Sequence, residues 1–272
     1  MKRTVVALAL LASTTFCAAR VGASTSMQWI LNGPVLPTLT TDPVAVKYFS
    51  GKTVFMVGRD GASVPAPSSW NVRETRIFTS YVQLQKAFES GRVGPEVKAI
   101  LYDNEHWKFT PEDEQRNFGE YAKRVAELVH AHGLLLFTAP ADTLTRDYGT
   151  PAGEPRYEAY LRLKLAAQAA QYSDVFEIQS QGSEMNPKRF SSFVREASAQ
   201  ARAANPGVRV FAGISTSPNG QPVSEEQLAA AVDATREAVD GYWLNVPAQS
   251  EYCPNCAFAP EKALALIGRL AP

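Results

Sequence analysis

The feature that most constrains the fold is a repeated alternation of short apolar segments with longer segments of helical periodicity. The apolar segments are expected to be strands, with a helix after each one. Strands are predicted at residues 28–32, 53–57, 75–81, 98–102, 134–138, 175–179, 208–214 and 242–245. Helices are predicted at residues 43–50, 82–90, 111–130, 156–171, 187–204, 224–239 and 261–270.

Strands that alternate with helices are typical of an α/β fold with a parallel sheet. Eight such units in about 250 residues predict a (β/α)8 barrel of the TIM type. The alternative is a doubly wound open parallel sheet. Its nucleotide-binding form is disfavoured, since the sequence has no Gly-x-Gly-x-x-Gly after the first strand and no P-loop. Residues 24–272 are expected to form one domain.

The first 23 residues have the pattern of a secretory signal peptide. A charged start at Lys2-Arg3 precedes an apolar run from Val5 to Ala12, and small residues follow at Val21-Gly22-Ala23. The apolar run is too short to span a bilayer. We expect cleavage after Ala23 and a secreted or periplasmic protein that has no membrane contact after cleavage.

Two cysteines remain after this cleavage, in the sequence Cys253-Pro-Asn-Cys256. In an oxidising compartment such a pair is expected to form a structural disulfide that fixes a loop. A redox motif and a metal site are the alternatives. Cys17 would be removed with the signal peptide, with a lipid anchor on Cys17 as the alternative.

The strongest candidate site follows the predicted strand at residues 98–102. Side chains alternate between the two faces of a strand, so one face carries Ala99, Leu101, Asp103 and Glu105. Thr110-Pro111 is expected to begin the next helix, with Thr110 as its N-cap. Acids between a strand and a helix stand where barrels place catalytic groups. We therefore predict that Asp103 and Glu105 are catalytic.

Other polar and aromatic residues end the predicted strands and are expected to contact the substrate. They are Asn32, Asp60, Tyr81, His106, Trp107, Gln179, Gln181, Trp243 and Asn245. Glu177 shares a strand face with Gln179. It is expected either to line the polar pocket or to pair with a basic group below it.

Carboxylates, amides and aromatic rings together are typical of a sugar-binding site. In this interpretation Glu105 is the general acid, and repulsion from Asp103 raises its pKa.

The chain has 27 basic and 27 acidic side chains and no basic block, so we expect a carbohydrate substrate and no nucleic-acid partner. No Gly-x-Ser-x-Gly elbow is present. We expect no cofactor, and we expect the protein to be a monomer.

Asp103-x-Glu105 resembles the end of the D-x-x-D-x-D-x-E motif of chitinase-like (family 18) glycoside hydrolases. The resemblance implies that Glu105 is the acid and that Asp103 supports a substrate acetamido group that acts as nucleophile. Trp243 matches the tryptophan that ends the eighth strand in that family. The chain departs from the family at Lys98 and Leu101, where the earlier acids would stand, and at residues 178–181, which replace Met-x-Tyr-Asp.

The pair Asn104-Glu105 also resembles the Asn-Glu of another large clan of barrel glycosidases. That clan places a nucleophilic Glu on the seventh strand, and residues 208–216 contain none. Two other functions stay open: a non-catalytic carbohydrate-binding barrel, and a metal-dependent hydrolase with ligands from Asp103, Glu105 and His106. No metal is expected, because residues so close on one strand converge poorly on one ion.

Overall fold

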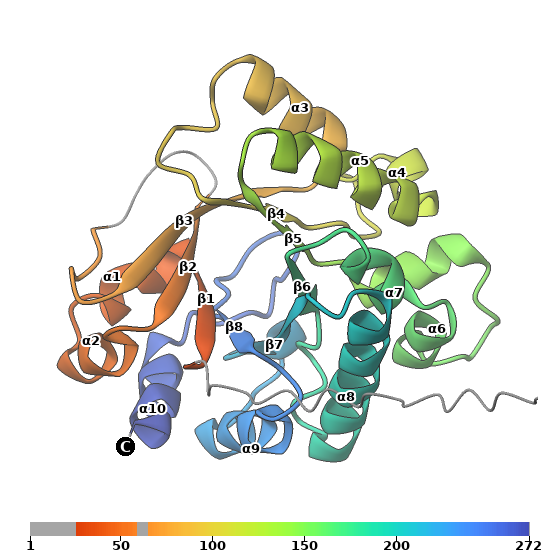
Figure 1. Ribbon diagram of the computed structural model, residues 1–272. Helices are drawn as coiled ribbons and strands as arrows, with labels where there is room; N and C mark the ends of the chain where they lie inside the picture. Colours follow the sequence, from red (N-terminus) through yellow and green to blue (C-terminus); the bar gives the residue numbers. More distant parts are fainter. Residues whose placement is uncertain (1–25, 59–64, 272) are drawn as a thin grey trace, which may run out of the picture.

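The computed structural model describes residues 26–58 and 65–271, and in them eight parallel strands form a closed barrel (Figure 1). Each strand pairs with the next along the chain, and β8 pairs with β1. The strands are β1 (Gln28–Asn32), β2 (Thr53–Gly58), β3 (Asn71–Phe78), β4 (Ala99–Tyr102), β5 (Leu135–Thr138), β6 (Val175–Ile178), β7 (Arg209–Ser215) and β8 (Gly241–Asn245). The predicted (β/α)8 barrel is confirmed, and the open-sheet alternative is wrong. The expected signal peptide (1–23) and Asp60 lie outside the described residues.

Helices surround the barrel (Figure 1). They are α1 (Leu36–Leu39), α2 (Pro43–Phe49), α3 (Tyr81–Glu89), α4 (Glu112–Arg116), α5 (Phe118–Ala131), α6 (Arg156–Arg162), α7 (Leu165–Ala170), α8 (Pro187–Ala204), α9 (Glu225–Thr235) and α10 (Pro260–Leu270), with 3-10 turns η1 (Gly33–Val35), η2 (Asp142–Tyr148) and η3 (Pro218–Gly220). The described part of the connection from β2 to β3, residues 65–70, contains no helix. Among the described helices, none has the length and apolarity needed to cross a membrane.

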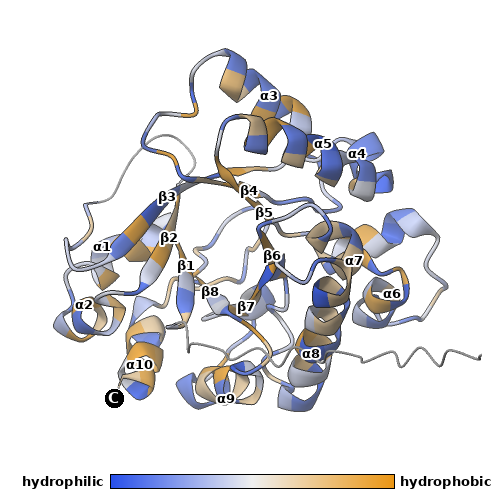
Figure 2. Ribbon diagram, in the orientation of Figure 1, coloured by the Kyte–Doolittle hydropathy of each residue, from blue (hydrophilic) through white to orange (hydrophobic). Residues whose placement is uncertain are grey.

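The apolar core has two parts, one between the strands and the helices and one inside the barrel. Figure 2 shows mostly hydrophobic residues along β4 and β5, and both hydrophobic and hydrophilic residues on the outer helices. Inside the barrel the rings of Phe55, Phe137 and Phe211 meet edge to face, with centroids 4.6 to 6.1 Å apart. The interior is therefore packed rather than open, and it supports the polar layer above it.

Two predicted helices are each broken into two. Asn117 separates α4 from α5, and its side-chain amide donates to the carbonyl of Asp113 (3.0 Å), which competes with regular helical bonding. Lys164 separates α6 from α7 in a left-handed conformation (φ 55°), and the side chain of Gln168 donates to the carbonyl of Leu163 (3.0 Å). Periodicity alone did not reveal either break.

The third strand ends earlier than predicted. β3 stops at Phe78, and the Ser80 hydroxyl then caps α3 by accepting from the amide of Gln83 (3.2 Å). The expected N-cap role of Thr110 is also wrong. Its hydroxyl donates to the carbonyl of Thr79 (2.8 Å) and accepts from the indole of Trp107 (2.9 Å), so it ties the β4–α4 loop to the end of β3.

Candidate active site

A pocket of about 1010 Å³ lies where the strands end at their carboxyl side. This volume is near the upper end of the range for small-ligand sites and has room for an extended substrate. Eight of the residues proposed from the sequence line it: Asn32, Asp103, Glu105, Trp107, Gln179, Gln181, Trp243 and Asn245. The order of the strands thus brings together side chains from β1, β4, β6 and β8.

Two other proposed residues do not line this pocket. Tyr81 is the first residue of α3 and packs against Tyr121, with ring centroids 6.1 Å apart. His106 faces a neighbouring hollow, where its Nδ1 lies 2.7 Å from Oδ2 of Asp147. The structure therefore separates Tyr81 and His106 from the acid pair.

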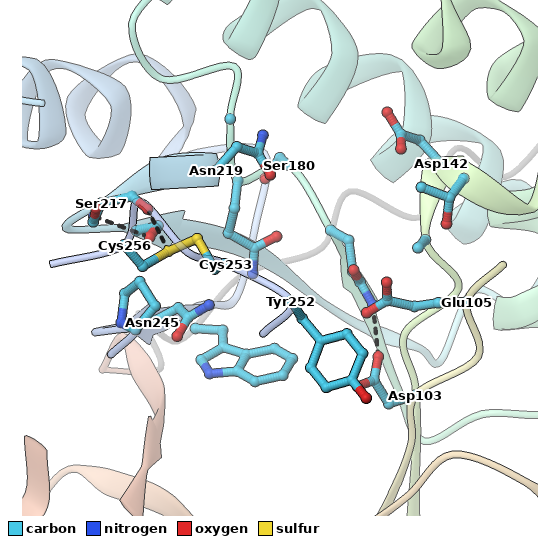
Figure 3. Close-up of a pocket in the computed structure, with 18 of the residues that line it drawn as sticks. Asp103, Glu105, Asp142, Ser180, Ser217, Asn219, Asn245, Tyr252, Cys253 and Cys256 are labelled. Atoms are coloured by element: carbon cyan, nitrogen blue, oxygen red, sulfur yellow. Dashed lines mark hydrogen bonds between the residues drawn. A yellow bond between two sulfur atoms is a disulfide. The ribbon is translucent and has the colours of Figure 1, made fainter. Parts of the chain in front are cut away.

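The acid pair extends the inward face of β4. Ala99 and Leu101 belong to the apolar cluster inside the barrel, and Asp103 and Glu105 continue the same alternation into the pocket (Figure 3). Asn104 is fully buried on the other side, where its amide donates to the hydroxyl of Tyr102 (2.7 Å). The local strand geometry therefore places both carboxyl groups in the pocket and turns the intervening amide away from it.

A side chain from the β6 end fixes Asp103. The Gln179 amide donates to Oδ1 of Asp103 (2.7 Å) and to the carbonyl of Ala139 (2.8 Å), and the first bond is drawn as a dashed line in Figure 3. This amide bridges three adjacent strand ends. Asp103 is thus held in one orientation beside Glu105.

The environment of Glu105 favours its neutral form. Burial raises the pKa of Glu105 to about 8, with further contributions from the charges of Asp103 and Asp142 and a smaller opposing one from the Gln179 amide. Repulsion from Asp103 was predicted as the cause. It contributes, but burial is the larger cause. A carboxylic acid in this site therefore keeps its proton at neutral pH.

Glu177 lies inside the barrel, fully buried and outside the residues that line the pocket. Neither carboxyl oxygen has a hydrogen-bond partner among the described residues, so the expected pairing with a basic group is not observed. Burial raises the pKa of Glu177 well above its ordinary value, and the nearby charges of Asp103 and Glu105 add to this shift. The surroundings of Glu177 therefore favour its neutral form.

The pocket also has unused hydrogen-bonding atoms. Asn32 donates from Nδ2 to Oδ1 of Asn245 (3.2 Å), which joins the first and last strands. The Oδ1 of Asn32 and the indole nitrogen of Trp243 are buried and have no partner among the described residues. Since buried polar atoms are rarely left unpaired, these two are candidates to bind a polar ligand.

A glycine in β7 makes room for Gln181. A Cβ built on Gly213 would lie 2.3 Å from Nε2 of Gln181. Any side chain at residue 213 would therefore displace the Gln181 amide from its place in the pocket.

Sequence reasoning did not select three groups that line the pocket. Asp142, at the start of η2, pairs with Arg156 of α6 (3.2 Å), and burial raises the pKa of its carboxyl. Arg189 of α8 also lines the wall, and Tyr252 exposes 51% of its surface at the rim. Asp142 had a signal, since it follows the fifth strand. The other side chains come from helix starts and a long loop, where periodicity says little about position.

The predicted disulfide between Cys253 and Cys256 is confirmed. It fixes the loop between β8 and α10, which forms part of the pocket wall (Figure 3). The backbone amide of Ala257 in this loop donates to the hydroxyl of Ser217 (3.3 Å), which fastens the loop to the segment after β7. The disulfide thus stabilises the position of Tyr252, which directly precedes it.

Within the described ranges, no group of three or more His, Cys, Asp or Glu residues is arranged to hold a metal ion. The metal-dependent alternative therefore has no ligand set in this part of the chain. The chemistry of the pocket residues is that of carboxyl groups, amides and aromatic rings.

No protein-family model matches the chain, and no curated protein matches it. Among solved structures, it is similar to hydroxymethylglutaryl-CoA lyase from Pseudomonas aeruginosa, with a TM-score of 0.55, 14% identity and coverage of 91% of this chain and 86% of that one. It is also similar to a curdlan-specific exo-beta-1,3-glucanase of family GH128 from Blastomyces gilchristii, with a TM-score of 0.50, 13% identity and coverage of 89% and 97%.

The protein is a (β/α)8 barrel with a carboxyl-rich pocket at its strand ends. The lyase and the glucanase share this fold although their chemistry differs, so the likeness establishes the fold alone. The resemblance to family 18 stays a prediction.

Proposed function

We propose that the protein is an exported glycoside hydrolase that cleaves a polysaccharide or glycoconjugate, with Glu105 as the general acid. The observation that carries the proposal is the position of Glu105: it lines an open pocket, and its environment holds its pKa at about 8. A general acid must carry its proton at the working pH, and an ordinary glutamic acid does not.

The rest of the pocket supports a sugar as the ligand. The unpaired Oδ1 of Asn32 and the indole N–H of Trp243 suit sugar hydroxyl groups, which both accept and donate hydrogen bonds. The rings of Trp107 and Tyr252 at the rim suit the apolar face of a sugar ring. Hydrogen-bonding groups beside aromatic rings match the two faces of a pyranose.

The second carboxyl group of the reaction has two candidates. Asp103 is oriented by Gln179, and Asp142 is paired with Arg156. Burial raises the pKa of Asp142, and the charge of Arg156 opposes this shift. The one that lies across the glycosidic bond from Glu105 would activate water or form the glycosyl intermediate. The configuration of the first product at its anomeric carbon, measured by proton NMR, distinguishes inversion from retention.

Export and a monomeric state belong to the same proposal. The expected signal peptide at residues 1–23 would direct export, and the disulfide between Cys253 and Cys256 is compatible with an oxidising compartment.

The test is a glycan panel incubated with residues 24–272 and, in parallel, with the Glu105→Gln variant. The panel includes curdlan, chitin, xylan and pectin, and new reducing ends are the readout. Release by the wild type and a loss of roughly 100-fold or more in the variant support the proposal. Equal release by both proteins overturns the role of Glu105. Binding by both proteins without any release would identify the non-catalytic carbohydrate-binding alternative.

A further inference from the structure

One wall of the pocket is cationic. It is formed by the starts of α6 and α8, which contribute Arg156, Tyr157 and Arg189 to the lining. The chain as a whole has no net charge, so these arginines are not the result of an overall basic composition.

The two arginines differ in their partners. Arg156 is paired with Asp142 at 3.2 Å. The guanidinium of Arg189 lies 5.7 Å from the centre of the Tyr157 ring and makes no ion pair or side-chain hydrogen bond with another described residue. Arg189 is exposed and therefore presents to the pocket a cation that forms no ion pair of its own.

The charges along the pocket are unevenly placed. Asp103 lies at the β4 end, whereas Arg156 and Arg189 come from the starts of α6 and α8. Asp142 forms an ion pair with Arg156, and the charge of Arg189 also acts on Asp142. Arg189 itself forms no ion pair with a described residue, so its guanidinium is available to a ligand.

We infer that the substrate is an acidic glycan, in which a sugar near the cleaved bond carries a carboxylate or a sulfate that Arg189 binds. This inference rests on the proposed function and deepens it. The planar guanidinium matches either anion with two parallel N–H donors, and such charge-assisted bonds are about twice as strong as neutral ones. A neutral glycan offers the Arg189 guanidinium no such charge-assisted bond.

The experiment measures binding by calorimetry to full-length mature protein that carries Glu105→Gln, so that no glycan is cleaved. The probes are matched pairs of short oligosaccharides: galacturonan and its methyl ester, glucuronan and cellulose, and chondroitin sulfate and its desulfated form. For at least one pair we expect the acidic member to bind about tenfold more tightly. High salt is expected to reduce this preference.

Variants on α8 assign the preference to one side chain. Arg189→Gln is expected to remove it, and Arg189→Lys to retain part of it. Lys188→Gln is the matched control, because Lys188 is exposed on the same helix and does not line the pocket. The pairs also distinguish a carboxylate from a sulfate as the bound group.

A preference that persists in Arg189→Gln overturns the inference, as does equal binding within every pair. In that case neutral glycans can still be bound by the Glu105→Gln protein and cleaved by the wild type. The proposed function then stands, and only the inference of an acidic substrate is wrong. If no probe is bound and none is cleaved by the wild type, both fail.

Discussion

Replacement of Glu105 by glutamine is expected to stabilise the fold, and to do so more strongly as the pH rises from 5 to 8. The pKa of this carboxyl is raised from 4.5 to about 8 on folding. Between these values the folded protein keeps a proton that the unfolded chain has released, so the stability of the wild type falls with rising pH. The cost is about 1.4 kcal/mol per pH unit. Over the range from pH 5 to pH 8 this amounts to roughly 3 to 4 kcal/mol.

The assay is urea unfolding of the wild type and Glu105→Gln at each pH unit from 5 to 8. Glutamine has no proton to lose, so the difference in unfolding free energy between the two proteins should grow with pH. Glu177 and Glu184 also have raised pKa values, with burial as the main cause in both proteins. The contribution of the Glu105 charge to the Glu177 pKa is lost in the variant, and this loss adds to the same difference. Glu127→Gln, on the exposed face of α5, is the control and should show no such growth. A difference that stays constant with pH would refute the buried-acid reasoning for Glu105.

Three further predictions concern the pocket. Asp142→Asn removes a like charge near the general acid and should shift the basic limb of the pH–rate profile down by about half to one pH unit. Tyr252→Ala should raise KM about three- to tenfold and leave kcat nearly unchanged, whereas Phe258→Ala, which removes an aromatic residue of similar exposure outside the pocket, should leave both constants unchanged. Gly213→Ala should displace the Gln181 amide and raise KM with little loss of folding stability, as thermal unfolding would show.

The barrel was predictable from the sequence because parallel strands and covering helices have different hydrophobic periods, and here the two alternate regularly. The acid pair was predictable for the same reason. The period of two that buries Ala99 and Leu101 also directs Asp103 and Glu105 into the pocket. These are local rules, and local sequence is enough to apply them.

The remaining features depend on contacts between distant segments. The helix breaks at Asn117 and Lys164 follow from side-chain amides that bind backbone carbonyls, which apolar spacing does not reveal. Tyr81 lies away from the pocket because Ser80 begins a helix two residues after β3 ends. The main cause of the raised pKa of Glu105 is burial, which only the folded surroundings determine.

The charged wall and the rim were the least predictable parts of the site. Arg189 lies on the exposed start of a helix, and Tyr252 lies in a long loop before the disulfide. Sequence patterns give little information about where such segments lie, since their positions depend on packing against other loops.

The most direct test of the central claim compares Glu105→Gln with the wild type on two substrates of the same sugar. One is the natural oligosaccharide that the glycan panel identifies, and the other is its dinitrophenyl glycoside, whose leaving group needs no proton. If Glu105 is the general acid, kcat on the oligosaccharide should fall by about 100-fold or more, and kcat for glycosyl transfer from the activated substrate by less than about tenfold. Equal losses on both substrates, or no loss on either, would contradict the assignment.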